Sequence, residues 1–95
     1  MEGRVFSYIH FNGQIGSMVK ISTMTDFAAR TDEFNLFGKS MAQQIAMTNP
    51  NNVDDLLEQQ FIRDDTISIK DMISAMSKEL GEKITIEDFS RFNIK

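Results

Sequence analysis

Very few side chains in this chain could carry out covalent chemistry. His10 is the only histidine, cysteine is absent, and no serine elbow stands near that histidine. Nucleophilic catalysis needs a nucleophile that a positioned base activates, and zinc sites need several thiolates or imidazoles. The residue types therefore predict that the protein is not an enzyme and that it holds no metal and no cofactor.

Acidic pairs and two glycines are the remaining candidates for ligand-binding chemistry. The side chains of neighbouring residues diverge on a helix or a strand, so the acidic pairs are interpreted as solvated surface. Gly13 and Gly16 have the spacing of a loop that clamps a nucleic-acid backbone, but such loops join two helices, whereas these glycines lie in a predicted hairpin. The acidic pairs are Asp54-Asp55, Asp64-Asp65 and Glu87-Asp88.

The composition is that of an ordinary globular protein. Hydrophobic residues make up 41% and charged residues 25% of the 95 residues, which is typical of a chain that folds, and one domain is expected over residues 1–95. The net charge of −4 argues against nucleic acid and membrane partners and favours a protein partner. No apolar run reaches the roughly 18 residues of a membrane span, and no leader is recognisable. We therefore expect a cytoplasmic protein.

The first predicted element is a hairpin over residues 4–22. Apolar residues alternate on both sides of Asn12-Gly13, a dipeptide that favours a two-residue turn with positive φ at both centres. Such a turn pairs Phe6 with Val19 on one face and places Met18 on the other. Because both faces are partly apolar, we expect helices to cover one face and a second copy of the chain to cover part of the other.

A helix is predicted after this hairpin. Thr31 or Asp32 is expected to cap its start, and Asn49-Pro50 is expected to end it. A short helical stretch capped by Asn52 follows. The apolar stripe of the longer helix is interpreted as core and comprises Phe34, Phe37, Met41 and Ile45.

A second long helix and a strand complete the chain. Thr66 or Ser68 opens the helix, and Gly81 is suited to the left-handed residue that ends it. In the final strand the apolar alternation slips by one between Ile86 and Phe89, which predicts a bulge or a strand end. The element order β-β-α-(α)-α-β predicts an α+β fold of two layers, a three-stranded antiparallel sheet with helices on one face.

Stretches along nearly the whole chain match the pattern of one known family. In the first half they are Glu2-Gly3, Ser7-Tyr8-Ile9-His10, Asn12-Gly13, Ile15-Gly16, Thr25-Asp26-Phe27 with residues 28–34, residues 41–47 and Asn49-Pro50. In the second half they are residues 58–62, Leu80-Gly81-Glu82 and residues 89–92. Together they resemble the core, or dimerisation, domain of translation elongation factor Ts.

This resemblance implies a guanine-nucleotide exchange factor for elongation factor Tu. It assigns Asp26 and Phe27 to a tip that intrudes near the Mg²⁺ and phosphate site of the GTPase, with Thr25 shaping the turn. It places Leu80 and Gly81 against the same partner domain and His10 at a further contact.

The residues of the tip also have a simpler interpretation when they are considered without the resemblance. Asp26 could cap a helix turn, and Phe27 could belong to the core of this domain itself.

The chain also departs from the family pattern. The resemblance implies a minimal core that lacks the small N-terminal helical domain and the helical excursion between the positions of Pro50 and Glu58. Met24, Ala28 and Glu87-Asp88 replace residues usual in the family. A single-copy core predicts a homodimer, and the missing domain leaves an alternative function, a module that captures elongation factor Tu without accelerating nucleotide release.

Overall fold

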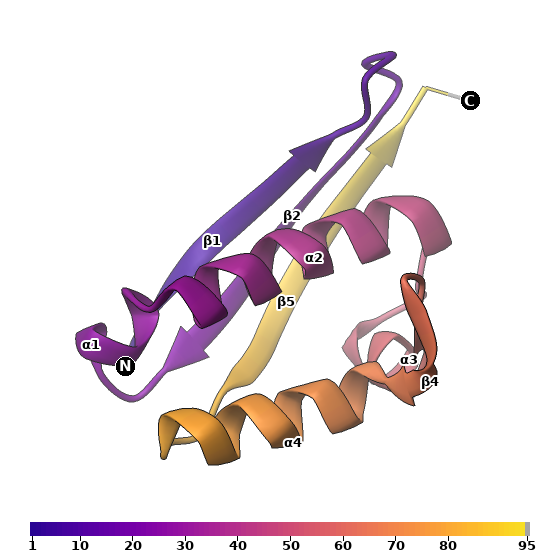
Figure 1. Ribbon diagram of the computed structural model, residues 1–95. Coiled ribbons are helices and arrows are strands. Elements are labelled where there is room, and N and C mark those ends of the chain that lie inside the picture. Colours follow the sequence, from indigo (N-terminus) through magenta and orange to yellow (C-terminus); the bar gives the residue numbers. More distant parts are fainter. Residues whose placement is uncertain (95) are drawn as a thin grey trace.

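A three-stranded antiparallel sheet forms one layer of the protein. The computed structural model describes residues 1–94, and Figure 1 shows how its elements are arranged. Strand β2 (Ile15–Thr23) lies in the centre, between β1 (Glu2–Ile9) and β5 (Thr85–Asn93). Helices pack on one face of this sheet, so the predicted α+β fold of two layers is confirmed.

The register of the β1–β2 hairpin is the predicted one. Phe6 pairs with Val19, and both side chains are buried beneath the helices. Met18, on the opposite face of β2, is 54% exposed. The alternation of apolar residues therefore fixed which face of the hairpin meets the core, because a slip by one residue would have turned every side chain to the other face.

The turn of this hairpin differs from the predicted one. The Gly13 N–H donates to the His10 carbonyl at 2.7 Å, and Gly13 has a positive φ of 72° whereas Asn12 does not. The Asn12 side chain instead accepts a hydrogen bond from the Gln14 N–H, so this local bond replaces the strand pairing next to the turn. The register survives because the His10 N–H still donates to the Ile15 carbonyl.

A bulge interrupts β5 at the predicted position. The pairing of β2 with β5 shifts between Lys20 and Ile21, which leaves Glu87 as an extra residue in β5. Ile86 is buried, and Phe89 packs against the same core although the two residues are separated by an odd number of positions. The bulge therefore restores the apolar phase of the strand.

Helix α2 (Asp32–Thr48) begins and ends at the residues that the sequence indicated. Thr31 is its N-cap, and the Thr31 hydroxyl accepts a hydrogen bond from the Phe34 N–H. Asn49 ends the helix in the left-handed conformation, with φ 51°. The cap prediction is thus confirmed for Thr31, the first of the two alternatives.

Helix α4 (Ile69–Leu80) begins at Ser68, whose hydroxyl accepts a hydrogen bond from the Asp71 N–H. Thr66, the other predicted cap, lies within a short strand instead. Gly81 adopts φ 74° at the C-terminal end, where a residue with a Cβ would be disfavoured.

Helix α3 (Val53–Glu58) is capped by Asn52 as predicted, but the small hairpin after it was not predicted. Strands β3 (Gln60–Phe61) and β4 (Asp64–Ser68) form this hairpin. The fully buried Gln44 of α2 ties it down, because the Gln44 side chain bonds to the backbone at Gln60 and Ile62 and to the Gln59 side chain.

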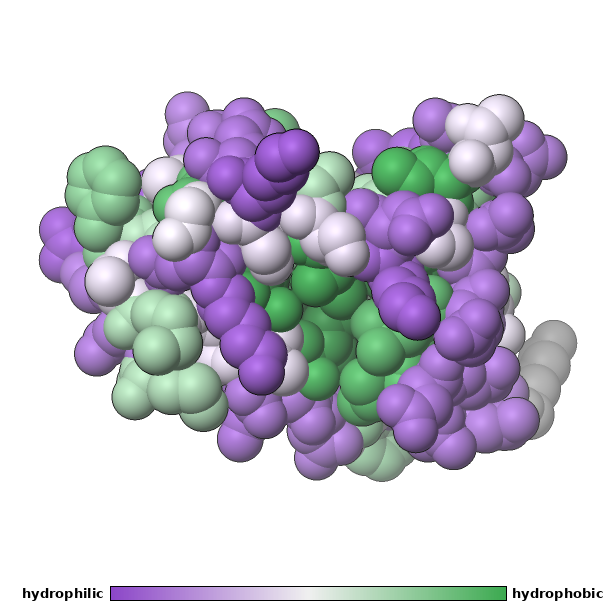
Figure 2. Space-filling view, turned by 90° about the horizontal axis from the view of Figure 1, so that it is seen from below, coloured by the Kyte–Doolittle hydropathy of each residue, from purple (hydrophilic) through white to green (hydrophobic). Residues whose placement is uncertain are grey.

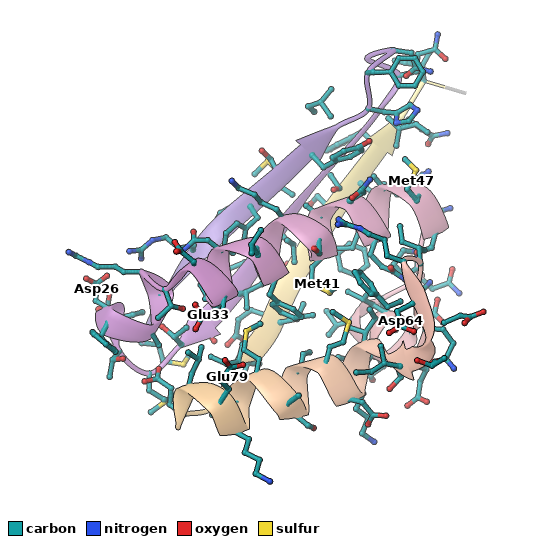
Figure 3. The ribbon with its side chains drawn as sticks, in the orientation of Figure 1. Asp26, Glu33, Met41, Met47, Asp64 and Glu79 are labelled. Atoms are coloured by element: carbon teal, nitrogen blue, oxygen red, sulfur yellow. The ribbon has the colours of Figure 1, made fainter. Side chains whose placement is uncertain are left out.

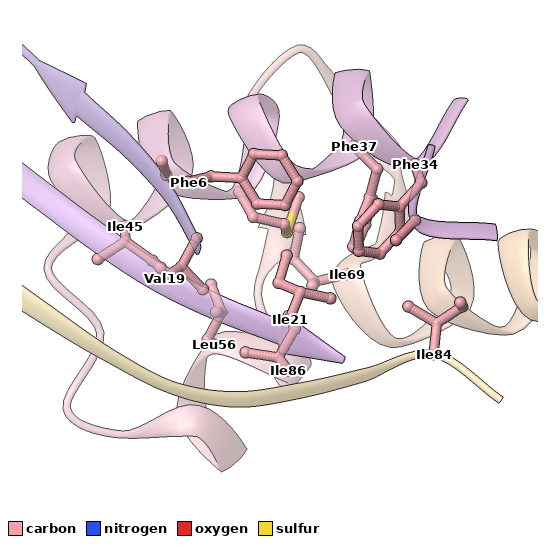
Figure 4. Packing of buried hydrophobic residues seen from close by; sticks show 13 residues of the cluster. Phe6, Val19, Ile21, Phe34, Phe37, Ile45, Leu56, Ile69, Ile84 and Ile86 are labelled. Atoms are coloured by element: carbon pink, nitrogen blue, oxygen red, sulfur yellow. The ribbon is translucent and has the colours of Figure 1, made fainter. Parts of the chain in front are cut away.

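The hydrophobic core fills the space between the sheet and the helices (Figure 4). Phe6 meets Phe34 of α2 edge to face, with 5.6 Å between ring centroids. Helix α4 closes this core only in part: Ile69 is its one fully buried residue. Figure 2 views the molecule from the side where α4 lies and shows hydrophobic side chains gathered inside a hydrophilic border. The half-buried apolar residues of α4 are Met72, Ile73, Met76 and Leu80.

Candidate partner-binding site

The Thr25-Asp26-Phe27 segment forms a tip at the connection from β2 to α2. Residues Asp26–Ala29 form the short helix α1, and the Thr25 hydroxyl caps it by accepting a hydrogen bond from the Ala28 N–H at 3.2 Å. Ala28 and Ala29 are buried, whereas Phe27 is 81% exposed. The tip therefore has an apolar root inside the fold and an aromatic ring outside it.

This geometry overturns the simpler interpretation of the two central residues. Phe27 does not belong to the core of this protein, since only about one fifth of its surface is covered. Asp26 does not cap the helix, because Thr25 does so and Asp26 is the first helical residue.

Two arginines hold the Asp26 side chain. Arg4 of β1 donates to Asp26 Oδ1 at 3.1 Å, and Arg30 donates to Asp26 Oδ2 at 2.6 Å. These two hydrogen bonds, first the one from Arg4, lower the pKa of Asp26 below its ordinary value of 3.8. Both ion pairs are substantially exposed, so solvent screens them. Asp26 is accessible from the end of the molecule that carries α1, as Figure 3 shows.

Glu82, in the loop between α4 and β5, binds the residues just before the tip. Its Oε1 accepts hydrogen bonds from the Met24 N–H at 2.7 Å and the Thr25 N–H at 2.9 Å, and its Oε2 accepts one from the Thr25 hydroxyl at 2.8 Å. These hydrogen bonds, chiefly the one from the Thr25 hydroxyl, lower the pKa of Glu82 below its ordinary value of 4.5. One carboxylate thereby joins two segments that are far apart in the sequence.

Glu82 brings five of the six predicted site residues to one end of the molecule. Leu80 and Gly81 directly precede it, with Leu80 packed against the core and Gly81 exposed. Thr25, Asp26 and Phe27 lie on the other side of its hydrogen bonds.

His10 lies elsewhere. It follows the last residue of β1, whereas the first residue of that strand, Glu2, pairs with Thr23 next to the tip. Eight strand residues separate the two positions by about 25 Å. The His10 ring is half-buried, forms a hydrogen bond with the Tyr8 hydroxyl at 3.0 Å and lies 4.5 Å from the exposed Phe11 ring.

The sequence reasoning missed the three residues that hold the tip in place. The contact of Arg30 with Asp26 was predictable, since the two residues are four positions apart and the side chains of such pairs meet on a helix. Arg4 and Glu82 had no local signal, because only the pairing of the strands and the return of the chain from α4 bring them to the tip.

The chemistry available at this end of the molecule is recognition by shape and charge. Within residues 1–94, no group of three or more histidine, aspartate or glutamate side chains is placed to hold a metal ion. No helix within the same residues is long and apolar enough to cross a membrane. What the tip offers is an exposed ring beside a carboxylate that already has two cationic neighbours.

Comparison with known proteins identifies the family. The model of the family described as Elongation factor TS matches residues 24–95, which include the tip, Leu80 and Gly81. Elongation factor Ts of Oleidesulfovibrio alaskensis is 34% identical to the chain over 138 aligned residues, covering 98% of this chain and 70% of the relative.

Two further relatives show the same similarity. Elongation factor Ts of Caldanaerobacter subterraneus is 33% identical over 136 residues, covering 96% of this chain and 68% of the relative. That of Clostridium acetobutylicum is 30% identical over 92 residues, covering 97% and 30%. The two longer alignments exceed the 95 residues of this chain, so those relatives carry residues within the aligned segment that have no counterpart here. The chain belongs to the elongation factor Ts family.

Proposed function

We propose that this protein is a guanine-nucleotide exchange factor for elongation factor Tu, and that it releases GDP by inserting the Asp26-Phe27 tip near the Mg²⁺ and phosphate site of the GTPase. The observation that carries this proposal is the 81% exposure of Phe27 on a tip whose base is buried. An exposed aromatic ring on a braced support is the arrangement that an insertion into a partner requires.

Exchange by this route needs no bond chemistry in the factor. A factor that binds the empty GTPase more tightly than the GDP-loaded GTPase weakens GDP binding by the same ratio, because binding free energies are reciprocal. Each tenfold loss of GDP affinity requires about 1.4 kcal/mol of differential interaction. Full burial of a phenylalanine side chain supplies about 1.5–3 kcal/mol, so Phe27 accounts for one to two factors of ten and other contacts supply the rest.

We assign the other contacts to the neighbours of Phe27. Asp26 would bring a carboxylate close to a metal and phosphate site and disturb its charge balance, while Arg4 and Arg30 keep that carboxylate oriented. Leu80 and Gly81 would pack against the same partner domain. His10, about 25 Å along β1 from the tip, would form a separate contact with another part of the partner.

The test is release of a fluorescent GDP analogue from elongation factor Tu with and without this protein. Exchange activity predicts faster release in proportion to the concentration of the protein, below saturation. Formation of a complex with an unchanged release rate would replace this proposal with the alternative, a module that captures elongation factor Tu without exchange.

We further propose that the protein is a homodimer formed through the open face of the sheet. This face carries a row of exposed apolar side chains, including Met18 in the central strand. Met18, Ile9 and Phe92 border a shallow groove of about 570 Å³ near the hairpin end. Exposed apolar residues that lie together on one face are typical of an interaction surface, and a two-fold axis through β2 would let each copy cover the other. The other exposed apolar residues of the face are Val5, Ile9 and Phe92.

A further inference from the structure

Glu82 binds the backbone that precedes the tip, although the two segments are far apart in the sequence. It is half-buried, its carboxylate accepts three hydrogen bonds, and all three donors belong to Met24 and Thr25. Two of these donors are backbone N–H groups at the point where β2 ends and the tip begins. Backbone donors in that position have no strand or helix partner of their own.

We infer that Glu82 is a positioning residue of the exchange tip: it holds the backbone before Asp26-Phe27 in one orientation and couples it to Leu80-Gly81. This inference rests on the proposed function, since it assigns a role within the same partner-binding site. Glu82 does not need to touch the partner to act in this way.

The connection of the tip to the rest of the protein shows why one carboxylate matters. Residues 24 and 25 are exposed, so no packed side chain fixes their backbone. The Thr25 carbonyl accepts hydrogen bonds from the Thr23 hydroxyl at 2.7 Å and from the Ala29 N–H at 3.4 Å, whereas Glu82 is the group that binds the Met24 and Thr25 N–H groups. The side chains of Arg4 and Arg30 bond to the Asp26 side chain rather than to the backbone of the tip. Removal of the Glu82 carboxylate would thus leave two backbone N–H groups to water.

The same carboxylate fixes the relative position of the two predicted contact segments. Glu82 directly follows Gly81, where the chain leaves α4 in a left-handed turn. A carboxylate with both oxygens engaged fixes direction as well as distance, because Oε1 bridges two donors and Oε2 binds a third. Phe27 and Leu80 would therefore reach the partner as one preformed surface, which lowers the entropy lost on binding.

The experiment compares Glu82→Ala with Glu82→Gln and with a control, Glu79→Gln. Glu79 is an exposed carboxylate in the last turn of α4, three residues before Glu82, so its change removes a similar charge. Glutamine can keep the two bonds made by Oε1 to the backbone N–H groups, whereas alanine keeps none. The first measurement is the NMR order parameter of the backbone amides at residues 24–27, with thermal melting as the check on the global fold.

The expected result is a graded loss of order at the tip. In the parent protein and in Glu79→Gln the order parameters should be near 0.85, and in Glu82→Ala they should fall below about 0.6, with Glu82→Gln in between. The second measurement is GDP release from elongation factor Tu. Glu82→Ala should slow the stimulated release about tenfold or more, the size of effect that misplacing a docking group produces, and Glu82→Gln should restore part of it.

The outcomes separate the failure of this inference from the failure of the proposed function. Unchanged order at residues 24–27 in Glu82→Ala would overturn the inference whatever the exchange rate. If Glu82→Ala loses order at the tip but keeps a normal exchange rate, while Phe27→Ala slows exchange, the inference is also overturned, because the tip would then work without being held. If the parent protein does not stimulate release at all, the proposed function fails, and with it the role of Glu82 in exchange. Should Glu82→Ala not fold, Glu82→Gln is compared with Glu79→Gln instead, and order at residues 24–27 equal in the two variants would overturn the inference.

Discussion

Replacement of Phe27 by alanine tests whether the ring contributes to partner binding or to the stability of the fold. Phe27 is 81% exposed, so about one fifth of its surface is covered in the protein alone. Full burial of a phenylalanine is worth about 1.5–3 kcal/mol, so the covered part contributes about 0.3–0.6 kcal/mol to the free energy of unfolding. In a domain of this size 1 kcal/mol corresponds to about 4–8 °C, so the melting temperature should fall by only about 1–5 °C.

The same arithmetic gives the expected loss of exchange. The exposed four fifths of Phe27 would supply about 1.2–2.4 kcal/mol on complete burial in a partner, which corresponds to a decrease of about 8- to 60-fold in the stimulated rate of GDP release. The assay follows a fluorescent GDP analogue on elongation factor Tu at sub-saturating concentrations of this protein.

Met47→Ala is the control for this experiment. Met47 is also an exposed apolar residue, and it lies near the C-terminal end of α2, away from the tip that precedes the start of that helix (Figure 3). Its replacement should leave the rate unchanged. A melting temperature more than about 12 °C lower in Phe27→Ala, as expected for a core phenylalanine that contributes about 3–5 kcal/mol, or an unaltered rate, would refute the reasoning.

Three further predictions follow from the polar groups and from the open face. The folded-state pKa values of Asp26 and Glu82 are lowered, so their contribution to the tip is complete above their ordinary values of 3.8 and 4.5 and is lost as pH falls through the lower folded values; the protection of the Thr25 amide from hydrogen exchange, expressed relative to the intrinsic exchange rate at each pH, should fall on acidification in that range and stay constant between about pH 6 and 8. Gln44→Ala should cost about 1–3 kcal/mol in thermal unfolding, because it removes a fully buried amide and leaves the part-buried Gln60 carbonyl and Ile62 N–H of the β3–β4 hairpin without their partner; a change below about 0.5 kcal/mol would contradict this. Met18→Glu should convert a dimer to a monomer in light scattering at micromolar concentration, and a parent protein that is already monomeric would remove the dimer proposal.

The parts of the fold that the sequence predicted are those set by short-range rules. Thr31 and Ser68 cap helices because a hydroxyl can reach the free N–H groups three residues ahead, and Gly81 ends one because it tolerates positive φ. The hairpin register followed from alternation alone, even though the turn itself had another geometry.

What the sequence did not predict depends on contacts between distant residues. The β3–β4 hairpin is too short to have a periodic signal, and it is held by Gln44, a buried amide that in the sequence resembles a surface residue of α2. The brace of the tip likewise joins Arg4 to Asp26 across 22 positions and Glu82 to Thr25 across 57. The motif therefore indicated the residues of the candidate site, and the structure shows which distant residues hold them in place.

The way in which the tip is held bears on how an exchange factor of this size could work. A ring held by packing would have to leave its own core before it entered a partner, and that cost would be subtracted from the free energy available to displace GDP. Here the buried Ala28 and Ala29 and the hydrogen bonds of Asp26 and Glu82 hold the tip, while Phe27 remains in solvent. Insertion of Phe27 into a partner then gains nearly all of the free energy of burying the ring, and no part of the factor has to unfold. Burial of the ring lowers the GDP affinity by at most two factors of ten. We therefore expect the remaining differential binding to come from Leu80 and Gly81, which Glu82 couples to the tip.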